Sequence, residues 1–294
     1  MVPARAEPVI GPAKGRTRWL GRDDIDFVRA PRPNRTTPMT SGPFDLTGKV
    51  AVVTGGNGGI GLGMARGLAE AGAGIAIVGR DEAKSDAALA DIKGRGVKAV
   101  SVIADVTDKA AVAAMVELVR RELGRIDILV NNAGINIRKT PQALDIEEWD
   151  SVIRTNLTSA FLCSQAVYPA MRAAGGGKII NIGSMMSIFG ASFAPAYAAS
   201  KGGIVQFTRS CACAWAADNI QVNAVLPGWI DTDLTRRARE QIEGLHDRVL
   251  ARTPAARWGA IGDFAGIAVF LASHASDFVT GTAIPVDGGF SVMG

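Results

Sequence analysis

The chain has 294 residues, of which 48% are apolar and 20% charged, a balance typical of a globular protein with a substantial core. Its net charge of +4 lies entirely in residues 1–42, which hold eight basic and four acidic residues, so a basic nucleic-acid-binding face on the remaining chain is not indicated. The three cysteines show neither disulfide nor metal-ligand spacing, which predicts a protein without a metal site. The sequence has no apolar run near the roughly 18 residues that span a bilayer and no apolar signal segment, so we expect a cytoplasmic protein.

The N-terminal segment 1–43 differs in composition from the rest of the chain. It contains seven of the thirteen prolines and shows no sustained apolar period. Such a segment has little apolar material with which to join a core. We therefore expect a flexible basic extension over 1–43 and a single folded domain over 44–294, with residues 1–38 dispensable for fold and catalysis.

From Lys49 onward, short apolar runs alternate with helical patterns. Strands that alternate with helices of 10–15 residues indicate βαβ units, a parallel sheet covered on both faces, and right-handed crossovers. The pattern predicts a single-domain α/β fold with a doubly wound, Rossmann-type parallel sheet. The expected strands are 49–55, 74–79, 97–105, 126–134, 177–184 and 220–228, and the expected helices are 62–73, 81–96, 108–124, 149–171 and 196–217.

A glycine-rich turn, "TGGNGGIGLG", connects the first strand to the first helix. Glycine lets the backbone approach a ligand closely, and the following helix N-terminus offers free N–H groups and a favourable dipole to a pyrophosphate. The spacing Gly55-x-x-x-Gly59-x-Gly61 differs from the commoner G-x-G-x-x-G. Because the turn follows an apolar strand and precedes an amphipathic helix, it predicts a dinucleotide site.

One of the two tyrosines, Tyr197, precedes Lys201 by one helical turn with only small residues between them. A free tyrosine has a pKa of about 10 and is a poor proton acceptor at neutral pH. A lysine on the same helical face favours the phenolate and lowers that pKa. The pair therefore predicts a general acid or base with room for substrate beside it.

These motifs, with "NNAG", "RTNL" and "PGWIDT", resemble the short-chain dehydrogenase/reductase family over residues 44–294. The resemblance implies a catalytic set in which Tyr197 transfers the proton, Lys201 tunes it and holds the nicotinamide ribose, Ser184 binds the substrate oxygen, and Asn156 interrupts its helix and holds a relay water. It also implies a homo-oligomer, either a tetramer or a dimer. The implied cofactor-binding residues, besides Tyr197 and Lys201, are Gly55, Asn57, Gly59, Ile60, Gly61, Arg80, Asp105, Val106, Asn132, Ala133, Gly134, Pro227, Gly228, Ile230 and Thr232.

The end of the second predicted strand bears on cofactor choice. An NAD-preferring fold usually carries an acidic residue there for the ribose 2′-hydroxyl, but this chain has Gly79 followed by Arg80. A guanidinium suits a 2′-phosphate, which it can bind through two hydrogen bonds. NADP is therefore favoured, and NAD remains the alternative, since Gly58 stands where NADP-preferring relatives often carry a second basic residue.

Substrate class follows from resemblance to the sugar-acid branch of the family, which implies a substrate of the gluconate/5-ketogluconate type. Arg138 and Lys139 follow the fourth predicted strand at its carboxyl end, where either cation could meet a carboxylate. Met185 could line the same pocket. Two alternatives stay open: a 3-oxoacyl-carrier-protein reductase built on the same catalytic set, and a non-enzymatic dinucleotide-binding sensor, whose members usually lack the tyrosine–lysine pair.

Overall fold

The computed structural model describes residues 42–293. The predicted N-terminal extension therefore lies outside the described residues, except for Gly42 and Pro43. No helix in the described part of the chain combines the length and the apolar character that crossing a bilayer requires.

Seven parallel strands form one sheet in the order β3-β2-β1-β4-β5-β6-β7. The chain starts in the middle at β1, moves outward to β3, and returns to the other side of β1 at β4, so the order reverses between β1 and β4. This topology confirms the predicted doubly wound parallel sheet. The strands are β1 (Val50–Thr54), β2 (Gly74–Gly79), β3 (Ala99–Ile103), β4 (Ile128–Asn131), β5 (Gly177–Ile182), β6 (Ile220–Pro227) and β7 (Ala283–Val286).

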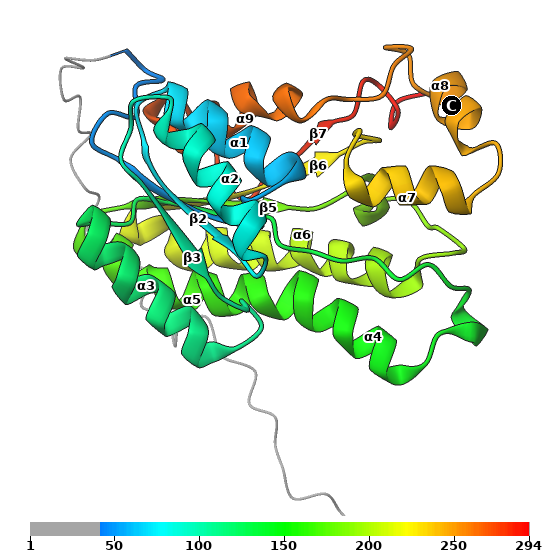
Figure 1. The fold of residues 1–294 in the computed structure, drawn as a ribbon, viewed down its shortest axis with the longest axis horizontal. Helices are drawn as coiled ribbons and strands as arrows, with labels where there is room; N and C mark the ends of the chain where they lie inside the picture. Colours follow the sequence, from blue (N-terminus) through cyan, green and yellow to red (C-terminus); the bar gives the residue numbers. More distant parts are fainter. Residues whose placement is uncertain (1–41, 294) are drawn as a thin grey trace, which may run out of the picture. The chain divides into compact units, whose positions relative to one another are not determined.

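Helices cover both faces of the sheet (Figure 1). One face carries α1, α2 and α9, and the other carries α3, α5 and α6. Alternate strand side chains supply the two cores: Ala51 and Val53 pack toward α1, whereas Val50 and Val52 pack toward α3 and α5. The helices are α1 (Gly59–Glu70), α2 (Glu82–Lys93), α3 (Lys109–Leu123), α4 (Ile146–Ile153), α5 (Ser159–Ala173), α6 (Pro195–Trp215), α7 (Asp233–Gln241), α8 (Leu245–Arg252) and α9 (Ala265–Ala272).

The carboxyl edge of the sheet collects the loops in which the sequence motifs lie. The glycine turn follows β1, "NNAG" continues β4, Ser184 follows β5, and Gly228 follows β6. Helices α7 and α8 lie at this same end, on the right of Figure 1. In open parallel sheets, ligands bind outside the carboxyl ends of the strands, so the fold gathers the motifs where a ligand is expected.

Two parts of the fold differ from the sequence-based expectation. The single helix predicted over 149–171 is divided by a π-helical turn at Arg154–Thr158, which separates α4 from α5. The strand β7 and the helices α7, α8 and α9 were not among the predicted elements. Strand β7 has only four residues and contains Pro285, so it lacks the continuous apolar run that identifies the inner strands.

Candidate active site

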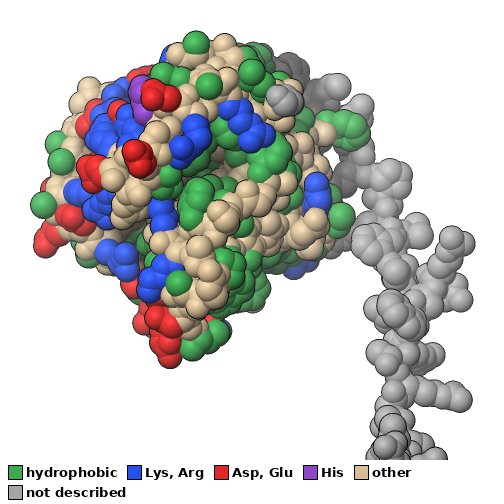
Figure 2. Space-filling view, turned by 90° about the vertical axis from the view of Figure 1, so that its right-hand side faces the viewer, with side chains coloured by type: hydrophobic (Ala, Val, Ile, Leu, Met, Phe, Trp, Pro, Cys, Tyr) green, Lys and Arg blue, Asp and Glu red, His purple; other side chains and the backbone are tan. Residues whose placement is uncertain are grey.

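A cavity of about 330 Å³ opens at the carboxyl edge, beside α6, α7 and α8. The side chains of Ser184 and Tyr197 lie on its wall. Its other lining residues are Asn136, Arg138, Met185, Met186, Phe189, Gly190, Ala191, Ser192, Phe193, Pro227, Gly228, Trp229, Leu234, Thr235, Arg252 and Phe290. Figure 2 shows this end of the molecule, where basic side chains gather around a hollow. We call this cavity the catalytic cavity.

Ser184 and Tyr197 line the same wall, and the serine hydroxyl acts on the tyrosine. The Ser184 hydroxyl accepts a hydrogen bond from the Met186 N–H at 3.1 Å, because Ser184 caps the short helical turn Met185–Ser187. Burial raises the pKa of Tyr197, while the neighbouring Ser184 hydroxyl and the charge of Arg138 partly offset that rise. Tyr197 is therefore protonated at neutral pH and suited to donate a proton.

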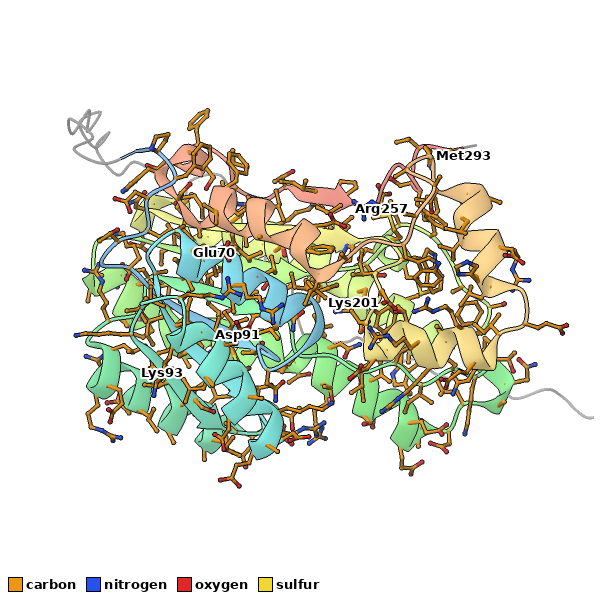
Figure 3. The ribbon with its side chains drawn as sticks, turned by 45° about the horizontal axis from the view of Figure 1, so that its top comes forward. Glu70, Asp91, Lys93, Lys201, Arg257 and Met293 are labelled. Carbon is orange, nitrogen blue, oxygen red and sulfur yellow. The ribbon has the colours of Figure 1, made fainter. Side chains whose placement is uncertain are left out.

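Lys201 lies one turn beyond Tyr197 in the interior of the molecule (Figure 3). Its Nζ donates a hydrogen bond to the Ile182 carbonyl at 2.7 Å and lies 5.6 Å from the centre of the Tyr197 ring. Burial lowers the pKa of Lys201 to about 8. The sequence led us to expect that Lys201 would lower the pKa of Tyr197; in this structure burial of the tyrosine is the larger effect and raises it.

Asn156 lies in the π-helical turn between α4 and α5. There the Ser159 N–H bonds to the Arg154 carbonyl, five residues back, instead of four. The Asn156 Oδ1 accepts a hydrogen bond from the Ile135 N–H at 2.8 Å. The Asn156 Nδ2 donates to the Ser200 hydroxyl at 3.0 Å. The helix is thus interrupted where the family resemblance places an interruption, and the asparagine side chain connects the "NNAG" loop to α6.

A second cavity, of about 430 Å³, lies between the ends of β1, β2, β3 and β4. We call it the cofactor cavity. Seven of the sequence-predicted cofactor residues line it: Gly55, Asn57, Arg80, Asp105, Val106, Ala133 and Gly134. Tyr197, Pro227 and Gly228 line the catalytic cavity instead. Six others line neither of the two cavities: Gly59, Ile60, Gly61, Asn132, Lys201 and Thr232. Ile230 is buried and borders a smaller cavity beside Trp229.

The glycine turn and the end of β4 are tied tightly together. The Asn132 side chain donates hydrogen bonds to the Thr54 and Gly55 carbonyls at 3.1 and 3.0 Å. A Cβ at Gly61 would come within 2.4 Å of both that amide and the Gly55 carbonyl, so only glycine fits there. Thr232, the N-cap of α7, lies against Gly59. The first turn of α1, which begins at Gly59 and contains Ile60, is thereby held beside the ends of β1 and β4, and the free N–H groups of a helix start suit an anion.

The cofactor cavity is lined by both cations and carboxylates. The cations are Arg80, Lys84 of α2 and Arg237 of α7, and the carboxylates are Asp81 and Asp105, which leaves one more positive than negative charge. Arg80 has only a loose carboxylate partner, with its Nη1 3.7 Å from Asp105 Oδ2. At Gly79, a Cβ would come within 2.2 Å of the Asn57 amide, so an acidic side chain at the end of β2 would collide with Asn57. These observations fit an anionic dinucleotide that carries an additional phosphate.

The structure separates the two cations that follow β4. Arg138 lines the catalytic cavity and donates hydrogen bonds to the Leu234 carbonyl at 2.9 Å and to Gln241 Oε1 at 3.1 Å, both in α7. Lys139 is absent from the lining of the cavity and pairs with Glu148 of α4 at 2.5 Å. Met185 lines the cavity and is at the same time buried in a small core cluster with Val205, Ala224 and Leu226.

Several residues that line the two cavities were not found from the sequence, among them three cations and an asparagine. Lys84 and Arg237 line the cofactor cavity, and Asn136 and Arg252 line the catalytic cavity. The Asn136 Oδ1 is buried and has no hydrogen-bond partner among the described residues. Lys84 comes one turn after Arg80, a spacing that could have identified it. The arginine-rich stretch of α7 gave no such indication, because its apolar period is too weak to show which arginine faces inward.

A doubly wound sheet with a serine, a tyrosine and a lysine at its carboxyl edge, beside a dinucleotide-sized cavity, is the arrangement that the sequence motifs predicted. Residues 55–291 match the family model described as enoyl-(acyl carrier protein) reductase. The chain belongs to the short-chain dehydrogenase/reductase family, and the predicted membership is confirmed.

Named relatives share nearly their full length with this chain. It is 44% identical over 84% of its length, and 94% of the relative's, to 2-dehydro-3-deoxy-D-gluconate 5-dehydrogenase of Formosa agariphila. It is 40% identical over 85% of its length, and 97% of the relative's, to gluconate 5-dehydrogenase of Gluconobacter oxydans. A solved gluconate 5-dehydrogenase from Burkholderia cenocepacia, in complex with NADP and tartrate, has 42% identity and a TM-score of 0.81 over 85% of this chain and 98% of its own.

Proposed function

We propose that this chain is an NADP(H)-dependent oxidoreductase that interconverts a secondary alcohol and a ketone of a sugar acid. The observation that carries the proposal is that Ser184 and Tyr197 line the wall of one cavity, whose described lining contains two arginines and no carboxylate. The relatives named for gluconate and 2-dehydro-3-deoxygluconate, and the neighbour solved with NADP, support the same substrate class and cofactor. NAD is the alternative cofactor.

In the direction of reduction, the nicotinamide cofactor supplies the hydride that forms the new C–H bond. Tyr197 gives its hydroxyl proton to the carbonyl oxygen, which completes the alcohol. Ser184 donates its hydroxyl hydrogen to that oxygen and stabilises the charge that develops on it, while its own oxygen accepts from Met186. Lys201 is fixed beside the Tyr197 ring by its hydrogen bond to the Ile182 carbonyl. We propose that the interrupted helix at Asn156 holds a water molecule that relays a proton back to Tyr197.

Several groups in the catalytic cavity favour a polyhydroxylated acid. Arg138 and Arg252 give the wall two positive charges, which favours an anionic substrate. The unpartnered Asn136 Oδ1 is an acceptor that a substrate hydroxyl could satisfy after a small rotation of the amide. We propose that Arg138 binds oxygens near the reacting carbon, since its charge acts on Tyr197. No substrate contact is proposed for Lys139, which pairs with Glu148.

One partly exposed aromatic side chain bears on the assembly of the protein. Helix α5 leaves Phe161 45% exposed, and its ring packs edge-on against Phe207 of α6, so a second subunit would have apolar surface to cover. This supports a homo-oligomer, with a tetramer or dimer as the family-derived expectation. Cytoplasmic residence rests on the sequence alone, as does the division into an extension over 1–43 and a domain over 44–294.

A substrate panel tests the proposed function. We expect NADPH-linked reduction of 5-keto-D-gluconate or NADP-linked oxidation of D-gluconate and 2-dehydro-3-deoxy-D-gluconate, each faster than with the NAD forms. Acetoacetyl thioester is the comparison substrate for the acyl-carrier-protein alternative. Preferred turnover of the thioester would favour that alternative, and dinucleotide binding without turnover of any substrate would favour the sensor.

A further inference from the structure

Arg252, the last residue of α8, has an unusual setting in the catalytic cavity. Its guanidinium carbon lies 5.0 Å from the centre of the Phe189 ring and 4.5 Å from the centre of the Phe290 ring. All three residues line the cavity that holds Ser184 and Tyr197. Three segments far apart in the sequence therefore meet to hold one cation at this wall.

The two rings beside the Arg252 guanidinium are inclined at 75° to each other, so the planar group can stack face-on against at most one of them. Both contacts place the cation over an aromatic ring, whose quadrupole attracts it. The N–H donors of a guanidinium lie in its plane and match the two oxygens of a carboxylate. The ring contacts thus hold the Arg252 charge at the cavity wall, which lowers the entropic cost of binding an anion there.

Among the described residues, Arg252 has neither an ion pair nor a hydrogen bond to another side chain. Three nearby arginines are paired: Arg236 and Arg239 of α7 with Asp231, and Arg257 with Asp263. Arg237 and Arg248 resemble Arg252 in having no ion pair among the described residues, but neither lines the catalytic cavity. The described lining of this cavity contributes no aspartate or glutamate. Arg252 is exposed, so its charge is solvated in the free protein and stays available to an anion that enters the cavity.

The other cation of the cavity is already engaged. Arg138 donates to the Leu234 carbonyl and to Gln241, and its charge acts on Tyr197, so it lies near the reacting end. We propose that Arg252 binds the substrate carboxylate, and that the substrate class is therefore an open-chain hydroxy acid or keto acid whose carboxylate is remote from the carbon that reacts. This inference rests on the proposed function, which it makes more specific.

The test compares Arg252→Gln and Arg252→Lys with a matched control, Arg248→Gln, which alters an exposed arginine one turn earlier on α8 that does not line the cavity. Substrates are 5-keto-D-gluconate and its uncharged amide. We expect Arg252→Gln to raise KM for the acid about 10- to 100-fold with a smaller change in kcat, and to leave the amide nearly unaffected. Arg252→Lys should recover part of the affinity, and the control should match wild type. Equal losses for the acid and the amide would overturn the proposal.

A binding measurement separates this inference from the proposed function. Tartrate, a dicarboxylate probe, is titrated calorimetrically into the enzyme–NADP complex of wild type and Arg252→Gln. We expect the variant to bind tartrate at least about 10-fold more weakly. If wild type turns over no sugar acid, the proposed function fails, and the titration still decides the role of Arg252. Absent binding in wild type, or equal binding in both proteins, would overturn it.

Discussion

Replacing Arg80 with alanine should weaken NADP binding and spare NAD. A charged hydrogen bond to a phosphate contributes about 1.5–3 kcal/mol, or roughly 10- to 150-fold in affinity. The Arg80 side chain is 67% exposed, and its partner Asp105 lies at 3.7 Å, so solvent screening places the effect at the lower end of that range. Lys84 and Arg237 also line the cofactor cavity and retain part of the positive field. We therefore expect KM for NADP to rise about 10-fold in the single variant and about 100-fold when Lys84→Ala is added.

The assay is steady-state kinetics with NADP and NAD at saturating substrate, supported by fluorescence titration of NADPH. Lys93→Ala is the control, because Lys93 lies in the last turn of α2, away from the cofactor cavity (Figure 3). Its KM values should match wild type. An equal rise in KM for both cofactors after Arg80→Ala would refute the reasoning, since it would show that Arg80 does not distinguish the 2′-phosphate from a hydroxyl.

Two further predictions concern stability. Burial lowers the pKa of Lys201 from 10.5 to about 8. Between these two pH values the unfolded chain therefore binds one proton more than the folded protein. In that window, the unfolding free energy of wild type relative to Lys201→Met should rise with pH by at most about 3 kcal/mol. Urea denaturation at about pH 7.5 and about pH 10 measures it, and a constant difference would contradict the lowered pKa. Deleting residues 1–38 should leave kcat/KM unchanged, since every sequence-predicted site residue lies at position 55 or later. A fall in Tm of more than about 4 °C would show that the segment stabilises the domain.

The inner sheet was predictable because its strands are short and rich in valine, isoleucine and alanine, and alternate with helical patterns. β1 and β2 are buried over nearly their whole length, so their sequences are unbroken by polar residues. The division of the predicted 149–171 helix was not visible as a boundary, since the π-helical turn at Arg154–Thr158 contains neither proline nor glycine. Its cause is tertiary: the Asn156 amide bonds to the Ile135 backbone, 21 positions earlier.

In the candidate site, residues that share one helix could be placed together from the sequence, whereas contacts between distant segments could not. Tyr197 and Lys201 share one helix, so their spacing alone placed them together. The setting of Arg252 depends on Phe189 and Phe290, which come from segments 63 positions before and 38 positions after it, and no local pattern indicates that meeting. Lys139 looked equivalent to its neighbour Arg138 in the sequence; only the position of Glu148 on α4 shows that it pairs away from the cavity.

The central claim is that Tyr197 donates the proton in an NADPH-linked reduction of a sugar-acid ketone. Single-turnover oxidation of NADPH by 5-keto-D-gluconate, in wild type and in Tyr197→Phe, tests it most directly. We expect wild type to turn over and the variant to lose the rate by about 100-fold to 10,000-fold, the usual contribution of a general acid, while its Kd for NADPH stays unchanged. A variant that keeps more than about a tenth of the wild-type rate would contradict the assignment.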